Sequence, residues 1–261
     1  MTITGSTRLY AIIGDPVAPL RSPALFNAAF ARQGRDAAFI AFQIGAGDLP
    51  RAWPGLLAMR NLDGLVITMP HKEAVVPLLT RLGPTAQLTG TVNTVRRDAS
   101  GGFEGDMFDG EGFRDGLERA GHVPRGARIL LVGCGAAGKA IACALARAGA
   151  AELTLHDATP GQAEALAAML QPLIRATPGL PDPRGHAIVI NATPMGLSEG
   201  DPLPMDVTLL SAAQLVADVI PNPEVTPLIA AARALGSATT TGRDMHEGQA
   251  RLAAAYLGIA D

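Results

Sequence analysis

Short apolar runs alternate with longer, alanine-rich stretches along most of this chain. The runs that predict strands lie at residues 9–13, 38–42, 65–68, 91–96, 129–132, 153–156, 187–191 and 215–219. The stretches that predict helices lie at residues 22–31, 48–60, 110–117, 139–148, 161–173 and 248–257, and Pro70 is expected to begin another. Alternation of this kind is typical of a mostly parallel sheet that is covered by helices.

The most distinctive turn follows the strand at 129–132, where the chain reads Ile-Leu-Leu-Val-Gly-Cys-Gly-Ala-Ala-Gly over residues 129–138. Its glycines, Gly133, Gly135 and Gly138, have the spacing of a dinucleotide-binding turn. In such a turn the first glycine permits the tight bend, the second lets a pyrophosphate approach the backbone, and the third lets helix and strand pack closely. The free N–H groups at the start of the next helix would face phosphates, so Ala136 and Ala137 join the expected cofactor site. A glycine-rich helix entry without a ligand is the alternative.

The chain has 261 residues, which is enough for one large or two modest domains. Because the glycine-rich turn lies in the second half, we expect an α/β protein with two domains. Residues 1–109 together with 238–261 would form an N-terminal mixed or parallel α/β substrate domain. Residues 110–237 would form a Rossmann-type, doubly wound domain that binds the dinucleotide.

Composition narrows the range of partners. A net charge of −3 and scattered basic residues give no surface suited to nucleic acid or a membrane. No basic leader precedes an apolar run, and no stretch has the roughly 18 apolar residues of a membrane span, so we expect a cytoplasmic protein. Cys134 and Cys143 are expected to be small buried thiols. The five histidines form no metal-binding pair, so no metal is expected.

Polar residues near strand ends are candidates for chemistry. Lys72 is expected near the positive end of a helix, which would disfavour its charged form, although a solvated surface lysine is equally compatible. Asp109 lies in a glycine-rich loop, where it is either a catalytic acid or base or a helix cap, and Asp106 competes for the first role. Asn93 is polar inside an apolar strand, so it needs either a ligand or structural hydrogen bonds.

Five local patterns, in their order and spacing, make the chain resemble the shikimate dehydrogenase family over nearly its full length. They are Gly14-Asp-Pro-Val-Ala-Pro-Leu-Arg-Ser-Pro23, Thr68-Met-Pro-His-Lys72, Val92-Asn-Thr94, Gly105-Asp-Met-Phe-Asp-Gly110 and Asn191-Ala-Thr-Pro-Met-Gly196. The resemblance implies an oxidoreductase of the shikimate pathway of aromatic amino acid biosynthesis. Such an enzyme transfers hydride reversibly between NAD(P) and the hydroxyl or carbonyl of a shikimate-like cyclic hydroxy acid.

The resemblance also implies roles for individual positions. Lys72 and Asp109 match the family's catalytic lysine and aspartate, which share proton transfer with the substrate. The positions that bind the substrate's carboxylate or hydroxyls are matched by Ser22, Thr68, Asn93 and Gln249. Asn191 and Thr193 complete the expected cofactor site.

The chain departs from the family pattern at several polar positions. The first of two serines in the opening loop is replaced by Leu20, with Arg21 beside it as a nearby cation. An asparagine in the strand before the lysine is replaced by Val66, and two polar residues before the aspartate are replaced by Met107 and Phe108. Because these changes remove hydrogen-bond partners, we expect shikimate to be a poor substrate and a related cyclic hydroxy acid to be the true one.

The expected cofactor follows from the end of the second nucleotide strand. Family members that use NADP carry Asn-Arg-Thr there, whereas this chain reads His156-Asp-Ala158. Asp157 would accept a hydrogen bond from a ribose 2′-hydroxyl and repel a 2′-phosphate, so NAD is expected in preference to NADP. A loop acid exposed to solvent is the other interpretation of Asp157.

Three functions stay open at this point. The leading hypothesis is a shikimate dehydrogenase-like enzyme acting on a small cyclic hydroxy acid as a monomer or homodimer. A quinate or quinate/shikimate dehydrogenase of catabolism or secondary metabolism is the alternative enzyme. A dinucleotide-binding regulator without catalysis is an alternative of another class, and the presence of both Lys72 and Asp109 argues against it.

Overall fold

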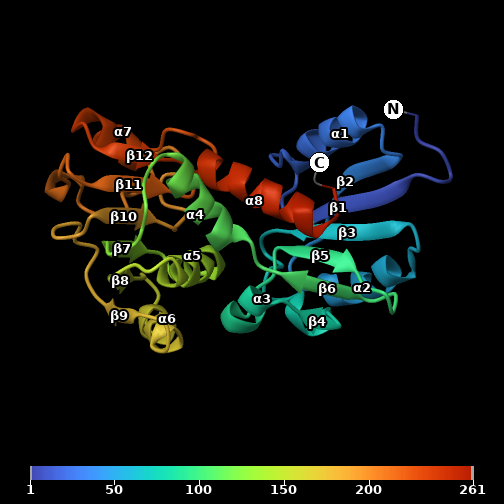
Figure 1. The fold of residues 1–261 in the computed structure, drawn as a ribbon, viewed down its shortest axis with the longest axis horizontal. Helices are drawn as coiled ribbons and strands as arrows, with labels where there is room; N and C mark the ends of the chain where they lie inside the picture. Colours follow the sequence, from blue (N-terminus) through green and yellow to red (C-terminus); the bar gives the residue numbers. More distant parts are fainter. Residues whose placement is uncertain (1, 260–261) are drawn as a thin grey trace. The chain divides into compact units, whose positions relative to one another are not determined.

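The computed structural model describes residues 2–259 and divides them into two compact units (Figure 1). The first unit comprises the described residues up to Phe108 and from Ala250 onward, and the second runs from Asp109 to Gln249. Each unit contains one six-stranded sheet. Within residues 2–259, none of the helices combines the length and apolar content that a membrane crossing requires.

The first unit is built on a mixed sheet with the strand order β2-β1-β3-β5-β6-β4. Its strands are β1 (Arg8–Gly14), β2 (Ala37–Gln43), β3 (Leu62–Ile67), β4 (Arg81–Leu82), β5 (Thr94–Arg97) and β6 (Phe103–Asp106). Strand β1 is parallel to β2 and β3, whereas β5 is antiparallel to both β3 and β6. The carboxyl ends of β1, β3 and β6 and the amino end of β5 therefore lie at one edge of this sheet.

Helices cover both faces of the first sheet. Successive side chains of a strand point to opposite faces, and here both sets are apolar and need to be buried. One face packs against α2 (Leu49–Ala58) through a core that includes Ala11, Ile13, Leu65, Ile67, Trp53 and Leu56. The other face packs against α1 (Ser22–Gln33) and the end of α8 (Gly242–Tyr256) through Tyr10, Ile12, Val66, Phe26, Phe30 and Ala253. The short helices η1 (Val76–Leu78) and α3 (Pro84–Thr89) complete the unit.

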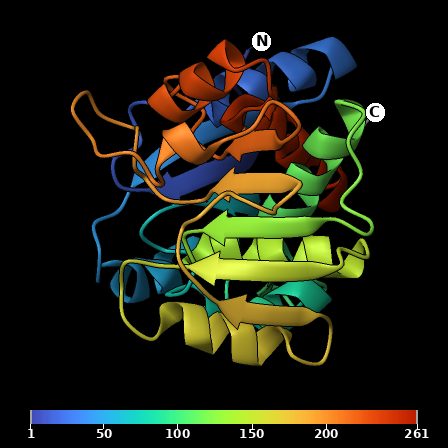
Figure 2. The same cartoon turned by 90° about the vertical axis from the view of Figure 1, so that its left-hand side faces the viewer.

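The second unit is built on a parallel sheet with the strand order β12-β11-β10-β7-β8-β9 (Figure 2). Its strands are β7 (Arg128–Val132), β8 (Glu152–His156), β9 (Arg175–Pro178), β10 (Ile188–Asn191), β11 (Leu215–Asp218) and β12 (Ala238–Thr240). Its other elements are α4 (Asp109–Arg119), α5 (Ala136–Arg147), α6 (Gln162–Leu170), η2 (Val207–Leu209) and α7 (Pro227–Ala234). Because the strand order reverses between β7 and β10, a ligand crevice is expected at their carboxyl ends.

The predicted fold class is confirmed: a mixed α/β sheet is followed by a Rossmann-type, doubly wound sheet. The apolar runs that predicted β1, β2, β3, β7, β8, β10 and β11 all form these strands, with small shifts of their ends. The prediction that Pro70 begins a helix is wrong. Turns follow β3 instead, because the Lys72 carbonyl, which a helix would bond to the residue four positions on, accepts from the Val92 N–H at 2.8 Å.

Four short strands, β4, β6, β9 and β12, lie where the sequence predicts none. Strand β9 ends at Pro178, inside a stretch whose prolines predict a loop, and it is an edge strand, where a proline is tolerated. Strand β12 pairs with β11, so residues 238–249 lie in the second unit, whereas we expected 238–261 to join the first. Strands this short carry too few residues for a periodic pattern to be recognised.

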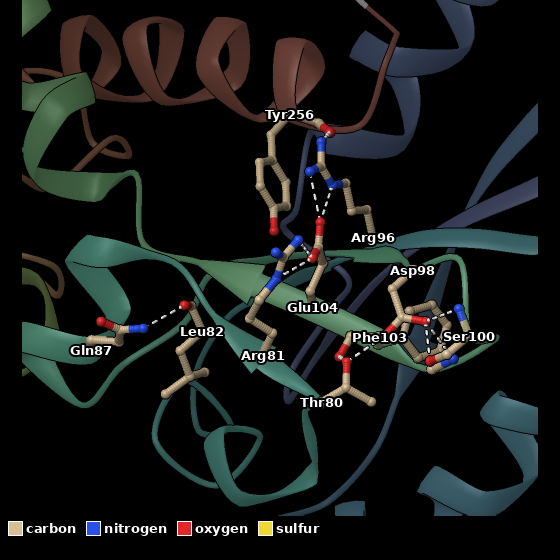
Figure 3. A network of polar contacts seen from close by, with 11 residues as sticks. Thr80, Arg81, Leu82, Gln87, Arg96, Asp98, Ser100, Phe103, Glu104 and Tyr256 are labelled. Atoms are coloured by element: carbon tan, nitrogen blue, oxygen red, sulfur yellow. Dashed lines mark hydrogen bonds and ion pairs between the residues drawn. The ribbon is translucent and has the colours of Figure 1, made fainter.

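An ion cluster secures one end of the first unit (Figure 3). The Glu104 carboxylate on β6, only 7% exposed, bridges two arginines: it pairs with Arg81, and it accepts from Arg96 Nε at 2.6 Å. Burial alone would raise the pKa of Glu104, but the hydrogen bonds from Arg81 and Arg96 outweigh it and leave this pKa below its ordinary value. Glu104 is therefore ionised in the folded protein at neutral pH.

We expect Glu104→Gln to lower the free energy of unfolding at neutral pH by about 1–2 kcal/mol, because one carboxylate serves both arginines. A lowered carboxyl pKa contributes stability above the ordinary value and loses it as the pH falls through the lowered value. The difference between wild type and Glu104→Gln in urea unfolding experiments should therefore shrink as the pH falls below the ordinary pKa of a glutamate. A difference that is independent of pH would contradict this assignment.

Candidate active site

One edge of the first sheet gathers three of the predicted site residues. Thr68 directly follows β3, and Lys72 lies in the turns after it. The Lys72 carbonyl accepts a hydrogen bond from the N–H of Val92, and the next residue, Asn93, accepts one from the N–H of Ile67 at 2.7 Å. These backbone bonds bring Thr68, Lys72 and Asn93 together where β3 ends and β5 begins. The turns around Lys72 take the place of the helix end that we expected to act on its charge.

Two of the positions that depart from the family pattern belong to one apolar cluster. Val66 on β3 is 4% exposed and packs with the phenylalanines of α1, and Leu20 packs against the same cluster. Ser22, the predicted carboxylate-binding residue, is half-buried at the first position of α1. Leu20, which stands two residues before the predicted serine, therefore contributes an apolar side chain.

Two buried polar side chains hold the segment that precedes Asp109. The Asn93 side chain, which is fully buried, accepts through Oδ1 from the N–H of Phe108 at 3.0 Å. Asp106 accepts through Oδ1 from the N–H of Met107 at 2.9 Å and from the N–H of Ala86 in α3 at 2.7 Å. Asp106 is thus committed to backbone groups, which argues against it as the competitor for the catalytic role. Asn93 lies just before β5, not inside it.

Asp109 begins α4 in the second unit and is 3% exposed. Glycines let this helix approach its neighbours closely. A Cβ atom at Gly110 would lie 2.0 Å from the carbonyl oxygen of Ala140 in α5. A Cβ atom at Gly112 would lie 2.5 Å from the backbone nitrogen of Gln249 in α8. The helix that begins with Asp109 therefore packs directly against the part of α8 that carries Gln249, another predicted substrate-binding residue.

The glycine-rich turn has the backbone geometry that its glycine spacing predicts. Gly133 has φ 103°, a left-handed conformation that favours glycine. A Cβ atom at Gly138 would lie 1.9 Å from the Gly133 carbonyl oxygen, so strand and helix meet as the spacing predicts. Helix α5 begins at Ala136, and the N–H groups of Ala136, Ala137 and Gly138 precede the first intrahelical donor, Lys139. These groups and Gly135 fit a pyrophosphate.

Asp157 follows β8 and is half-buried. Its carboxylate accepts from the N–H of Cys134, inside the glycine-rich turn, at 2.7 Å, and from the N–H of Thr159 at 2.8 Å. The acid thus fixes the turn as well as standing at the expected ribose position. Cys134 and Cys143 are buried and unpaired thiols, as predicted, and burial raises the pKa of Cys134 to about 12 and of Cys143 to about 11.

Asn191, at the end of β10, is fully buried, and its side chain holds the turn that follows the strand. Its Oδ1 accepts from the N–H and hydroxyl of Thr193, and its Nδ2 donates to Asp218 at 3.2 Å. Asp218 also accepts from the Thr226 hydroxyl at 2.8 Å, and burial raises the pKa of this carboxyl. The turn held in this way covers the glycine-rich turn, since a Cβ at Gly133 would lie 2.6 Å from the Ala192 carbonyl carbon.

Sequence reasoning missed Asp218, although a signal exists. Like Asp157 and Asn191, it is a polar residue at the carboxyl end of a strand of the parallel sheet. Within residues 2–259, no three His, Cys, Asp or Glu side chains lie close enough to hold a metal ion. The predicted site residues of the second unit thus lie in a glycine-rich turn, at strand ends and at the start of α4, where the aspartate is buried.

A doubly wound sheet with a glycine-rich turn between its central strand and the next helix is typical of nicotinamide-dependent oxidoreductases. Residues 12–95 match the family model of the shikimate dehydrogenase substrate binding domain. Over 260 residues the chain is 38% identical to the shikimate dehydrogenase (NADP(+)) of Moorella thermoacetica, covering 93% of this chain and 85% of the relative. The chain belongs to the shikimate dehydrogenase family, as the sequence patterns predicted.

Solved structures agree with this assignment. Quinate dehydrogenase from Corynebacterium glutamicum, in complex with NAD, has a TM-score of 0.87 and 32% identity, covering 96% of this chain and 93% of that one. The ligand-free 5-ketofructose reductase of Gluconobacter sp. strain CHM43 has a TM-score of 0.85 and 32% identity, covering 96% and 92%. The protein is therefore a shikimate dehydrogenase-like oxidoreductase that acts on CH–OH groups with a nicotinamide dinucleotide.

Proposed function

We propose that this enzyme transfers hydride reversibly at a ring hydroxyl of a shikimate-like cyclic hydroxy acid, with Lys72 and Asp109 as the catalytic pair. The observation that carries the proposal is the gathering of Thr68, Lys72 and Asn93 at one sheet edge, from which the chain runs through residues 106–108 into Asp109. Bound nicotinamide supplies the hydride acceptor or donor. Ser22, Thr68, Asn93 and Gln249 are the proposed substrate-binding residues.

Proton transfer to and from the substrate oxygen is the part of the reaction that the protein's own side chains perform. As a hydroxyl is oxidised to a carbonyl, its oxygen must lose a proton, and in the reverse direction the oxygen must gain one. The Lys72 amine and the Asp109 carboxylate are the proposed acceptor and donor of this proton. Burial of Asp109 excludes water from its carboxylate, which favours transfer to the substrate over exchange with solvent.

For the cofactor, we propose NAD in preference to NADP. The Asp157 carboxylate stands at the end of β8 and is held by two backbone N–H groups, and the residue beside it is an alanine, not a cation. A fixed negative charge at this place disfavours a 2′-phosphate and accepts from a 2′-hydroxyl. The named Moorella relative uses NADP(+), whereas the similar quinate dehydrogenase structure holds NAD.

For the substrate, we propose that the apolar residues at positions 20, 66 and 107 disfavour shikimate. Leu20 and Val66 belong to one apolar cluster, and Met107 is fully buried, so none of these three offers a hydrogen bond to a substrate group. Quinate is the alternative acid. A second candidate is the ketone of an uncharged sugar. Leu20 favours it because one donor to a carboxylate is missing, and the similarity to 5-ketofructose reductase also supports it.

For the assembly, we propose a monomer or a homodimer in the cytoplasm.

The catalytic pair predicts the behaviour of two variants. We expect Lys72→Ala and Asp109→Asn each to lower kcat by about 10²–10⁴-fold, because proton transfer loses its partner. The Kd for the dinucleotide, measured by fluorescence titration, should stay unchanged. Glu73→Gln, a charge change beside Lys72, is the control and should keep wild-type turnover. A wild type that binds dinucleotide but oxidises none of a panel of cyclic hydroxy acids and sugars would favour the regulator.

The charge at Asp157 predicts a change of cofactor. In the double variant Asp157→Ser with Ala158→Arg, we expect the ratio of kcat/KM for NAD to that for NADP to fall by at least about tenfold. Asp157→Asn is the matched control, since it keeps an acceptor for the Cys134 N–H and removes only the charge. An unchanged ratio in the double variant would rule out the proposed role of Asp157.

The apolar opening loop predicts a gain of activity. Leu20→Ser restores a hydroxyl donor, and we expect it to raise kcat/KM for shikimate by about tenfold. Leu20→Ala removes the same apolar side chain without adding a donor, so it should not produce this gain. Steady-state kinetics with shikimate, quinate and a neutral keto sugar measure the effect. If wild type already uses shikimate better than the other two, the proposed substrate preference is incorrect.

A further inference from the structure

Phe108 is the last residue before Asp109, and both its backbone and its ring make contacts within the first unit. Its N–H donates to Asn93, as described above, and its ring packs against the ring of Tyr256, with centroids 5.2 Å apart and planes inclined by 54°. Such a tilted pair is a favoured arrangement of aromatic rings. Both residues are half-buried and both belong to the first unit.

Tyr256 is itself held by the ion cluster of the first unit. The guanidinium carbon of Arg96 lies 4.4 Å from the Tyr256 ring centroid, and Arg96 Nη1 donates to the Tyr256 carbonyl at 3.2 Å. Arg96 is fixed in turn by the buried Glu104 carboxylate (Figure 3). Burial, followed by the nearby Glu104 charge, raises the pKa of Tyr256 to about 12, so its ring stays neutral across the physiological range. Tyr256 therefore offers Phe108 a ring that is held in place by Arg96 and whose charge does not change with pH in this range.

The two aromatic residues lie at key places in the chain. Phe108 ends the connection from β6 to Asp109, the proposed catalytic aspartate. Tyr256 ends α8, which also carries Gln249 seven residues earlier, two helical turns away. The aromatic contact thus ties the segment leading into Asp109 to the end of the helix that bears a proposed substrate-binding residue.

We propose that Phe108 is a positioning residue, which through its contact with Tyr256 fixes the backbone that leads into Asp109. The proposal rests on the proposed catalytic role of Asp109. Asn93 and Asp106 restrain the backbone of residues 106–108, but they leave the side chain of residue 108 free to set where the segment lies against α8. Since proton transfer depends steeply on distance, a small displacement of this segment lowers turnover without changing what the enzyme binds.

The test compares the variants Phe108→Leu, Tyr256→Leu and their combination in the full-length enzyme, with the best substrate of the panel. Each single variant should lower kcat about tenfold while KM and the dinucleotide Kd change less than about twofold. The double variant should be no slower than the single ones, because both remove the same contact. Tyr256→Phe keeps the ring and should restore nearly wild-type kcat. If Phe108→Leu does not fold, Tyr256→Leu reports the same contact.

A second aromatic cluster in the same unit supplies the control. Tyr10 packs against Phe30 at 5.4 Å, and Arg35 lies over the Tyr10 ring at 5.5 Å, but none of the three adjoins a proposed catalytic residue. Phe30→Leu should lower the melting temperature and leave kcat per folded molecule unchanged. An equal fall of kcat in Phe30→Leu and Phe108→Leu would reduce Phe108 to a purely structural role and overturn the proposal.

The outcomes for Phe108 and Asp109 are separable. If Asp109→Asn is fully active, the proposed function of Asp109 fails, whatever Phe108 does. If Asp109→Asn is inactive while Phe108→Leu keeps wild-type kcat, only the positioning role fails. Multiplicative effects of Phe108→Leu and Tyr256→Leu would also contradict it, because they would show that the two rings act independently.

Discussion

In each unit, backbone hydrogen bonds bring the ends of neighbouring strands to a single edge of a sheet, and the polar residues of the site stand on the loops that leave this edge. Strand interiors are apolar because both faces are covered, so polar chemistry has to begin where a strand ends. The first sheet achieves this with a mixed arrangement: antiparallel β5 starts where β3 stops, which sets Asn93 beside the loop of Lys72. The second sheet achieves it with parallel strands, whose ends carry Gly133, Asp157 and Asn191.

Close backbone approach is the second condition on which the site depends. Gly133 and Gly138 let the phosphate-binding turn, its strand and the neighbouring loop meet without side chains between them. Gly110 and Gly112 do the same for α4, whose first residue is Asp109. Beside these close contacts, carboxylate and amide side chains fix the loops: Asp106 and Asn93 do so in the first unit, and Asp157 and Asp218 in the second. Shape and polarity of the site thus come from main chain as much as from side chains.

The sequence was sufficient for much of the fold and for the family, because long apolar runs, glycine spacing and short motifs are local signals. It was not sufficient where tertiary contacts decide. Pro70 has the local signal of a helix start, yet the hydrogen bond between Lys72 and Val92 competes with the helix. Asp106 and Asp109 are alike in the sequence, and they differ only through the helices α3 and α4 that each adjoins. The aromatic contact of Phe108 joins residues far apart in the chain, which no periodicity could reveal.

The bond between Asp157 and the N–H of Cys134 has a consequence for the evolution of this family member. One carboxylate accepts a hydrogen bond inside the glycine-rich turn and also stands at the proposed ribose position, so a single codon determines both properties. A lineage that exchanges this acid for a larger cation loses an internal acceptor at the same moment, and the turn must then recruit another. Drift at this position is therefore restricted to short side chains that still accept a hydrogen bond, which leaves few mutational routes between the two dinucleotides.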